Sequence, residues 1–259
     1  MEAESIILDP RKMRCRRLRR TITEAAKLHE MYADHESASL GRSAYRKTFI
    51  TLTYRNAGEW ERCHVSRYVR LLRQWFNRRD HACRFVWVAE LQKRGALHYH
   101  MVVWVPRRLR LPRPDQCGWW PYGSSKIETA RNPIGYMVKY ATKTRPEDLK
   151  RLPKGVRLHG NGGHSGDARI YLREKLMPEW ARDRALITRI IMASRRRDAL
   201  IDAGEYDPDE DRCGVVDQPV LQRCTGGMVD LTTGEFIPSL WRVSYDHGVL
   251  SITKKPECV

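Results

Sequence analysis

Two apolar segments rich in β-branched and aromatic residues, RFVWVAEL and ALHYHMVVWV, lie so close in the chain that they are expected to pair with each other. Only Gln92 to Gly95 separate them. A three-residue hairpin loop from Lys93 to Gly95, with the glycine in the left-handed conformation, joins two antiparallel strands and sets their register. This register predicts that Glu90 lies opposite His98.

The two histidines of this hairpin are candidate metal ligands. Because side chains alternate along a strand, His98 and His100 share one face, and the register places Glu90 on that face at cross-strand contact distance. Two neutral imidazoles and a carboxylate bind a divalent cation and leave positions for water and a phosphate oxygen. We expect Mg²⁺ or Mn²⁺ here, although zinc also suits these donors. Histidines on a half-buried strand are also often only hydrogen-bonded polar residues, and that alternative stays open.

A helix with two tyrosines follows further along the chain. Asn132 is a good helix N-cap, and Pro133 suits the first helical position. In the helix IGYMVKYATK, Tyr136, Tyr140 and Lys143 form one stripe, and Lys139 lies beside it. A phenol near ammonium groups and a polarised phosphate is a candidate nucleophile. The alternative is a pair of tyrosines packed on the sheet with the lysines extending into solvent.

The remaining periodicity predicts an α+β fold. KTFITLTY, residues 47–54, alternates like a strand, and apolar residues recur at helical spacing from Val65 to Phe76. SKIETA is a possible short strand. The order of strand, helix, hairpin, strand and helix predicts an antiparallel sheet flanked by helices, and the aromatic residues of the first helix are expected in the core.

The charge of the chain indicates a polyanionic partner. The formal net charge is +17 and the pI is about 9.9, so nucleic acid is the expected partner. Residues 11–20 carry seven basic side chains, which form either an arm laid on phosphates or a solvated helix face. The aromatic loop 117–122 either stacks on bases or closes the edge of the core. The candidate nucleic-acid-binding residues are Arg16, Arg17, Arg19, Arg20, Lys93, Arg94, Trp119 and Trp120.

Several classes of protein are excluded by what the sequence lacks. No apolar run approaches the roughly 18 residues that span a bilayer, and the N-terminus does not have the order of a signal peptide. The seven cysteines include no Cys-x-x-Cys pair and are expected to be reduced thiols. No nucleotide-binding P-loop motif is present, so we expect no nucleotide cofactor, no membrane association and a cytoplasmic location.

We expect three segments along the chain. Residues 1–44 form a basic N-terminal arm, and residues 45–183 form the core domain. Residues 184–259 form a C-terminal extension with a helix, an acidic linker and short β-like runs, which are separated by turns at Thr225-Gly226-Gly227 and Thr233-Gly234. The glycine-rich stretch from His159 to His164 is expected to be a flexible loop.

The order of FITLTY, Glu90 with LHYH, and YMVKYATK resembles the three motifs of the HUH-superfamily rolling-circle replication initiators (Rep). The two-tyrosine Rep proteins of small single-stranded DNA phages are the most similar type. GVRLHGNGG and LREKLMPEW resemble the segments that follow the third motif in filamentous-phage and microvirus proteins. The resemblance covers roughly residues 47–180.

The resemblance implies a role for each matching residue. His98, His100 and Glu90 match the metal ligands, Tyr136 and Tyr140 match the paired nucleophiles, and Lys139 and Lys143 match the lysines that orient phosphate or water. It implies an RRM-like (ferredoxin-like) fold with HUH endonuclease and strand-transfer activity on single-stranded or hairpin origin DNA.

It also implies a host helicase and a host DNA polymerase as partners, in a bacterial cytoplasm. A transposase or relaxase role is a second reading of the same chemistry. A non-catalytic, basic single-strand DNA-binding or repressor protein is the alternative from another class.

Overall fold

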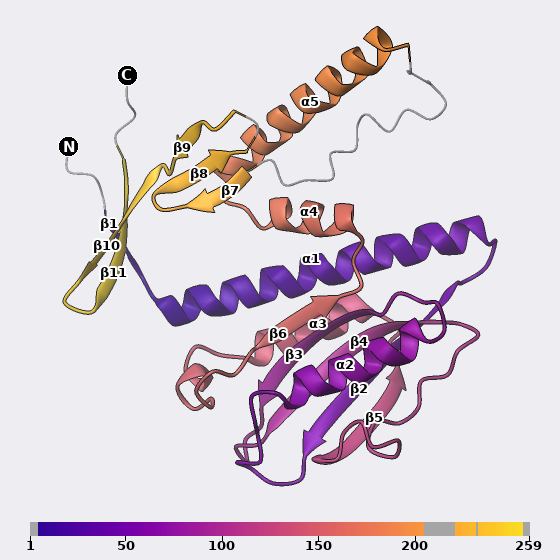
Figure 1. Cartoon of the computed structure of the whole chain (residues 1–259). Helices are drawn as coiled ribbons and strands as arrows, with labels where there is room; N and C mark the ends of the chain where they lie inside the picture. The colour runs from indigo at the N-terminus through magenta and orange to yellow at the C-terminus, as the bar shows by residue number, and fades with distance from the viewer. Residues whose placement is uncertain (1–4, 205–220, 232, 256–259) are drawn as a thin grey trace. The chain divides into compact units, whose positions relative to one another are not determined.

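The computed structural model describes residues 5–204, 221–231 and 233–255 (Figure 1). The chain forms two compact units, one of residues 11–164 and one of residues 1–10 with 165–259. The domain boundaries expected at 44/45 and 183/184 concern segments that fold independently, and they stay predictions.

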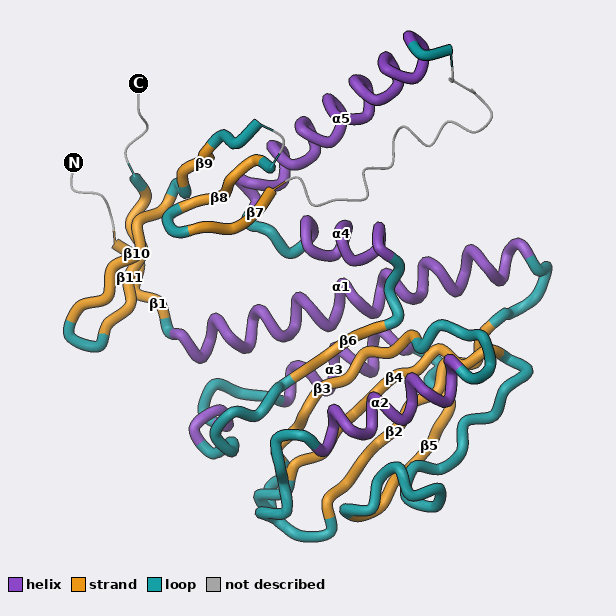
Figure 2. Tube along the Cα trace, in the orientation of Figure 1, coloured by secondary structure: helices purple, strands orange, loops and turns teal. Residues whose placement is uncertain are grey.

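A five-stranded sheet forms the centre of the first unit (Figure 2). Its strands lie in the order β5-β2-β4-β3-β6, and every neighbouring pair is antiparallel. The strands are β2 (Tyr45–Tyr54), β3 (Arg84–Leu91), β4 (Leu97–Pro106), β5 (Gly123–Thr129) and β6 (His159–Gly162). The predicted α+β class, with an antiparallel sheet flanked by helices, is confirmed.

Helices cover both faces of this sheet. On one face lie α1 (Pro10–Ser39) and α3 (Pro133–Lys143). Their side chains contact alternate residues of β4, since the His29 ring lies 4.7 Å from that of Trp104 and the Tyr140 ring lies 3.7 Å from that of His100. On the other face lies α2 (His64–Asn77). A short 3₁₀ helix, η1 (Asp148–Lys150), precedes β6.

Both sequence-predicted helices of the first unit form where expected. The apolar residues of α2, from Val65 to Phe76, are buried and belong to the core as predicted. The Asn132 side chain accepts a hydrogen bond from the Gly135 N–H at 2.8 Å, and Pro133 begins α3. The cap and the proline therefore fix where the tyrosine helix starts.

The segment from His159 to His164 differs from the prediction of a flexible loop. Residues 159–162 form β6, which pairs with β3 so that Trp87 lies opposite Gly160. A Cβ at Gly160 would lie 2.5 Å from the indole nitrogen of Trp87. The glycines are thus required for close packing at this sheet edge, which is a role that their sequence pattern does not distinguish from loop flexibility.

The basic stretch 11–20 is part of one 30-residue helix, α1. Cys15 and Leu18 are buried, whereas Arg16, Arg17 and Arg20 are exposed. The stretch is therefore the basic face of a packed helix, the second of the two alternatives given by the sequence. Contact of this face with DNA stays a prediction.

The second unit contains two helices and two small antiparallel sheets. The helices are α4 (Gly166–Lys175) and α5 (Glu179–Asp202). One sheet has the order β1-β11-β10, with β1 (Ser5–Leu8), β10 (Trp241–Asp246) and β11 (Val249–Lys254); the other has the order β7-β8-β9, with β7 (Leu221–Cys224), β8 (Gly227–Asp230) and β9 (Phe236–Pro238).

Met177, Ala181 and Ala185 form a small core with Leu221 and Met228. The predicted C-terminal strands are confirmed. Most of the predicted acidic linker lies outside the described residues. Within the described part of the chain, no helix has the length and apolar character needed to cross a membrane.

Candidate active site

The β3–β4 hairpin has the register that the sequence predicts. Glu90 lies opposite His98, and the Gln92 N–H donates to the Ala96 carbonyl across the loop. Gly95 has a φ of 85°, the left-handed conformation that the three-residue loop requires. The hairpin therefore brings Glu90, His98 and His100 to one face of the sheet from local sequence alone.

Glu90 and His100 are directly connected in this hairpin. The Oε2 atom of Glu90 lies 2.5 Å from Nε2 of His100, which is the diagonal neighbour and not the residue opposite. The Thr51 hydroxyl lies 3.3 Å from Nδ1 of the same imidazole and helps to orient it. His98 differs, because its Nε2 atom is buried and has no hydrogen-bond partner among the described residues.

The surroundings keep both imidazoles neutral and the carboxylate charged. Desolvation by burial lowers the pKa of His98 to about 4, with a further contribution from His100. Desolvation also lowers the pKa of His100, against the effect of Glu90. Burial by itself would raise the pKa of Glu90, but the hydrogen bonds from His100 and Lys143 lower it to about 2. At neutral pH this gives two imidazole lone pairs and one carboxylate, the protonation states that metal ligands require.

The α3 helix places both candidate tyrosines against this face. The ring of Tyr140 stacks on that of His100, with centroids 3.7 Å apart and an interplanar angle of 22°. Phe49 of β2 packs on both tyrosines, at 5.3 Å from Tyr140 and 4.9 Å from Tyr136. Of the two phenols, the Tyr140 ring thus lies against a candidate metal ligand, and the Tyr136 ring packs on Phe49.

The lysines of α3 surround the Tyr140 ring. Lys143 Nζ lies 4.6 Å from the ring centroid and 2.9 Å from Oε1 of Glu90, while Lys139 Nζ lies 5.9 Å from the same centroid. Burial raises the pKa of Tyr140, and the charge of Lys143 opposes this shift. Lys143 therefore connects the candidate nucleophile to the candidate metal ligands.

Four residues of this face were not identified from the sequence. Phe49 and Thr51 of β2 contact the tyrosines and His100, and Lys126 and Glu128 of β5 act electrostatically on Tyr140 or are affected by it. Lys126 and Glu128 form an ion pair of 2.9 Å. The alternation in FITLT and SKIET places these residues on one face, but it does not show which strands are neighbours.

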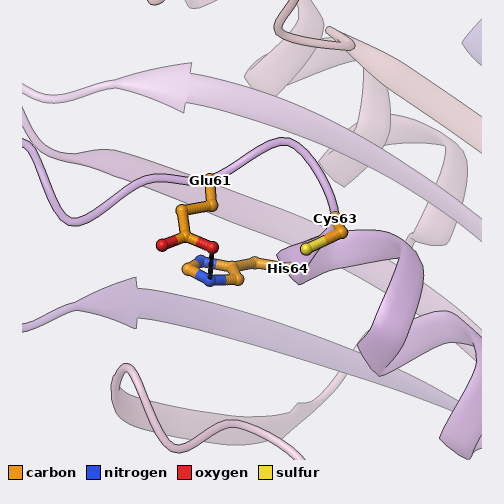
Figure 3. A group of neighbouring side chains, drawn as sticks. All are labelled: Glu61, Cys63 and His64. Carbon is orange, nitrogen blue, oxygen red and sulfur yellow. Dashed lines mark ion pairs between the residues drawn. The ribbon is translucent and has the colours of Figure 1, made fainter.

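The three donors of the hairpin satisfy a test for a metal site that a second group does not. Among the described residues, the one group whose donor atoms all lie within 4.8 Å of one another is Glu61, Cys63 and His64, at the start of α2 (Figure 3). There both ring nitrogens of His64 already have partners, Tyr54 at 3.1 Å and Glu61 at 3.3 Å.

In the hairpin the imidazole rings are 5.8 Å apart, but His98 Nε2 is buried without a partner. A buried, unpartnered nitrogen is unfavourable unless a proton donor or a cation meets it. The residues present therefore fit a divalent cation at the hairpin better than at α2.

The predicted nucleic-acid-binding residues divide into exposed and structural ones. Arg94 donates to the carbonyl oxygens of Tyr54 and Arg55, at 2.7 and 3.0 Å, and so fixes the hairpin loop to the end of β2. Trp120 is fully buried and its indole N–H donates to a main-chain carbonyl, so a base has no access to its ring. For Trp120 the prediction of base stacking is wrong and the core alternative holds.

Lys93 is exposed, and Trp119 is partly exposed with its ring 6.3 Å from that of Trp75. Arg19 is partly buried, unlike the exposed arginines of α1. Contacts of these residues with nucleic acid stay predictions.

Comparison with known proteins gives one match. Residues 47–145 match the family model for the replication-associated protein ORF2. No curated protein and no solved structure matches the chain significantly. The matched segment begins in β2, ends just after α3 and contains all seven residues of the predicted metal and tyrosine sites. This part of the chain is therefore similar to replication-associated proteins of the ORF2 family.

Proposed function

We propose that this protein is a rolling-circle replication initiator of the HUH type, which nicks and rejoins single-stranded origin DNA. The observation that carries the proposal is the stacking of Tyr140 on His100 at 3.7 Å, with Lys143 in contact with both Tyr140 and Glu90. A nucleophile, a cation and a candidate metal site thus meet on one face. The match to replication-associated proteins over the same residues supports the biological role.

The reaction is a transesterification that needs no ATP. The Tyr140 oxygen attacks the scissile phosphorus and the P–O3′ bond breaks, which leaves a 5′-phosphotyrosine. The phenolic proton is balanced by protonation of the released 3′-oxygen. Lys143 and Lys139 lie within 6 Å of the Tyr140 ring, where their charges favour the phenolate and hold phosphate oxygens. The new 3′-hydroxyl is the primer for a host polymerase, after unwinding by a host helicase.

Glu90, His98 and His100 are the residues that would hold Mg²⁺ or Mn²⁺. When bound, this cation supplies a Lewis acid for the scissile phosphate. The protein contributes the neutral imidazoles, through the lowered pKa values of His98 and His100, and the Thr51 contact that orients His100. Since Lys143 is paired with Glu90 here, a cation at this site would share or replace that contact.

Tyr136 provides the second nucleophile of the proposed cycle. It lies one helical turn before Tyr140, and both rings pack on Phe49. After one round of synthesis, Tyr136 attacks the regenerated junction, and the released 3′-hydroxyl attacks the phosphotyrosine of the first step. These steps close a circle and restore the first tyrosine.

The test is the covalent adduct between protein and DNA. A single-stranded DNA pool is incubated with Mn²⁺ and the protein, and the products are separated under denaturing conditions. We expect an adduct with wild type that disappears with EDTA and in the Tyr136→Phe/Tyr140→Phe double variant. The single variants show which hydroxyl attacks first, and the position of Tyr140 favours that residue.

Tyr171→Phe is the matched control, because Tyr171 is an exposed tyrosine on α4 of the other unit. An adduct that survives in the double variant would contradict the assignment of the nucleophiles. Salt-dependent DNA binding without any adduct, including on candidate origin sequences, would favour the non-catalytic alternative.

The histidines can be tested separately from DNA affinity. His98→Ala is expected to abolish the adduct and to leave most of the DNA affinity, because the positive charge lies elsewhere. Binding is measured by filter retention at fixed salt. A large loss of binding in this variant would indicate that His98 holds DNA or supports the fold instead.

A further inference from the structure

A groove with three arginines lies along α2, on the sheet face opposite α3. It has a volume of about 450 Å³. Its walls come from one side of α2, from β3 and from β6 with the residue preceding it. The lining residues are Val65, Ser66, Val69, Arg70, Arg73, Gln74, Asn77, Phe85, Trp87, Arg157, Gly160 and Asn161.

The charge of this groove is positive and is not neutralised within it. Its lining includes Arg70, Arg73 and Arg157 and no carboxylate. Among the described residues, no carboxylate forms an ion pair with any of the three. The whole α2 segment HVSRYVRLLRQWFN contains no acidic residue. A helix face that is only solvated ordinarily mixes both signs of charge, so this composition indicates a polyanion.

The groove is shaped by the packing of the sheet edge. The guanidinium of Arg73 lies over the Phe85 ring, 5.4 Å from its centroid. A Cβ at Gly162 would lie 2.7 Å from Nη2 of Arg73, so the glycine leaves room for this arginine to lie against the sheet. Arg73 is thus placed before any ligand arrives, which lowers the entropic cost of binding.

The other polar groups of the lining are those that bind phosphates. Ser66, Gln74, Asn77 and Asn161 add uncharged hydrogen-bond donors to the guanidinium groups. Arginine with amide and hydroxyl donors is the usual set for contacts to nucleic-acid phosphates. The lining runs along α2 from Val65 to Asn77, roughly 18 Å at 1.5 Å per residue. A groove extended along a helix suits a strand better than a single small anion.

We infer that this groove binds the phosphodiester backbone of a DNA strand, as a second contact outside the reaction centre. The inference rests on the proposed function in that the bound strand belongs to the DNA that the tyrosines cut. The sheet separates the two sites, because Phe85 and Trp87 point to the α2 side whereas Glu90 points to the α3 side. A strand therefore has to pass around the edge of the sheet to reach both sites.

The test compares two triple variants that remove equal charge. The groove variant is Arg70→Gln/Arg73→Gln/Arg157→Gln, and the control is Arg42→Gln/Arg107→Gln/Arg110→Gln, which changes exposed arginines outside the groove. Affinity for a single strand of about 30 nucleotides is measured by fluorescence anisotropy at several salt concentrations. We expect the groove variant to bind on the order of tenfold more weakly, with a salt slope smaller by about 2, and the control to lose clearly less.

The same assays separate this inference from the proposed function. Adduct formation on a saturating oligonucleotide of about 8 nucleotides is expected to be unchanged in the groove variant, because so short a strand does not reach both sites. Loss of long-strand affinity without any adduct in wild type would support the groove and contradict the nicking function. Adduct formation with equal affinity losses in the two triple variants would overturn the groove and leave the nicking function intact.

The source of the phosphate is tested by competition. If deoxynucleoside triphosphates displace the labelled strand from wild type as well as an unlabelled strand does, at equal phosphate concentration, the groove is a nucleotide site and the inference is wrong. Should the triple variant fail to fold by circular dichroism, Arg70→Glu serves in its place. This single reversal on an exposed position is expected to give the same loss of affinity, and an unchanged affinity would overturn the inference.

Discussion

Replacement of Glu90 by glutamine removes one negative charge from the centre of the candidate site and keeps the size of the side chain. The pKa of Glu90 is about 2, against an ordinary value of 4.5, because hydrogen bonds from His100 and Lys143 outweigh the desolvation. A shift of roughly 2.5 units corresponds to about 3 kcal/mol. Since a lowered pKa stabilises the fold above the unfolded value, this contribution is present at pH 7 and is lost as the pH falls from 4.5 toward 2.

We therefore expect Glu90→Gln to lower the free energy of unfolding by about 3 kcal/mol at pH 7, or roughly 6 to 12 °C in Tm for a unit of this size. Urea unfolding in metal-free buffer, followed by tryptophan fluorescence, measures the change. Six of the eight tryptophans lie in residues 11–164, so the signal mainly reports the unit that contains Glu90.

Glu61→Gln is the matched control. Its carboxylate also faces a histidine, His64, at 3.3 Å, but its side chain is 71% exposed, against 17% for Glu90. Exposed ion pairs contribute at most about 1 kcal/mol, so the control should be nearly neutral. A Glu90→Gln protein as stable as wild type would refute the reasoning, since it would mean that the burial of the carboxylate costs as much as its contacts return.

Manganese provides a second readout of the same pair of variants. Mn²⁺ at about a hundredfold over its Kd stabilises a native site by about 2.7 kcal/mol. Wild type and Glu61→Gln should therefore show a higher Tm with Mn²⁺, and Glu90→Gln should not. An equal increase in all three proteins would place the ion elsewhere.

The remaining predictions concern packing, titration and the hairpin loop. Burial, with nearby arginines, lowers the pKa of His159 to about 4, so the unfolded chain binds its proton more tightly between pH 6.5 and 4 and stability falls with pH in that window. Wild type should lose about 2 kcal/mol more than His159→Asn between pH 7 and 5 in urea titrations. Arg94→Ala should cost on the order of 1 to 3 kcal/mol, because two main-chain carbonyl oxygens lose their donor, whereas Lys93→Ala should be neutral; equal effects would contradict the structural role of the arginine. Gly160→Ala should lower the free energy of unfolding by at least about 1 kcal/mol, since its Cβ would lie 2.5 Å from an indole nitrogen, while Gly166→Ala meets open space and should not destabilise the protein; similar melting temperatures would argue against β6.

Much of the candidate site could be predicted because it depends on short-range geometry. The pairing of Glu90 with His98 follows from a three-residue loop, and the tyrosine stripe follows from a helix whose start is marked by Asn132 and Pro133. In each case the interacting residues are less than about twelve positions apart. Local backbone rules therefore define their arrangement before any tertiary contact forms.

The nucleic-acid-binding residues were harder to predict, because composition does not show burial. Trp120 has the sequence context of an exposed aromatic loop, yet it is fully buried beside Tyr54 and Tyr99. Arg94 looks like a free basic side chain, yet the carbonyl oxygens of β2 take up its donors. Both outcomes depend on segments distant in the chain, which local patterns do not identify.

The sequence by itself therefore determined the class of fold, the hairpin with its three polar ligands, and the helix with its tyrosines and lysines, since periodicity, turn chemistry and capping are local properties. Only the tertiary structure decided that Tyr140 lies against His100, that Lys143 pairs with Glu90, and that β6 forms a groove with α2. The physical reason is that these contacts join elements distant in the chain, and their geometry depends on which strands are neighbours and on which helices cover each face.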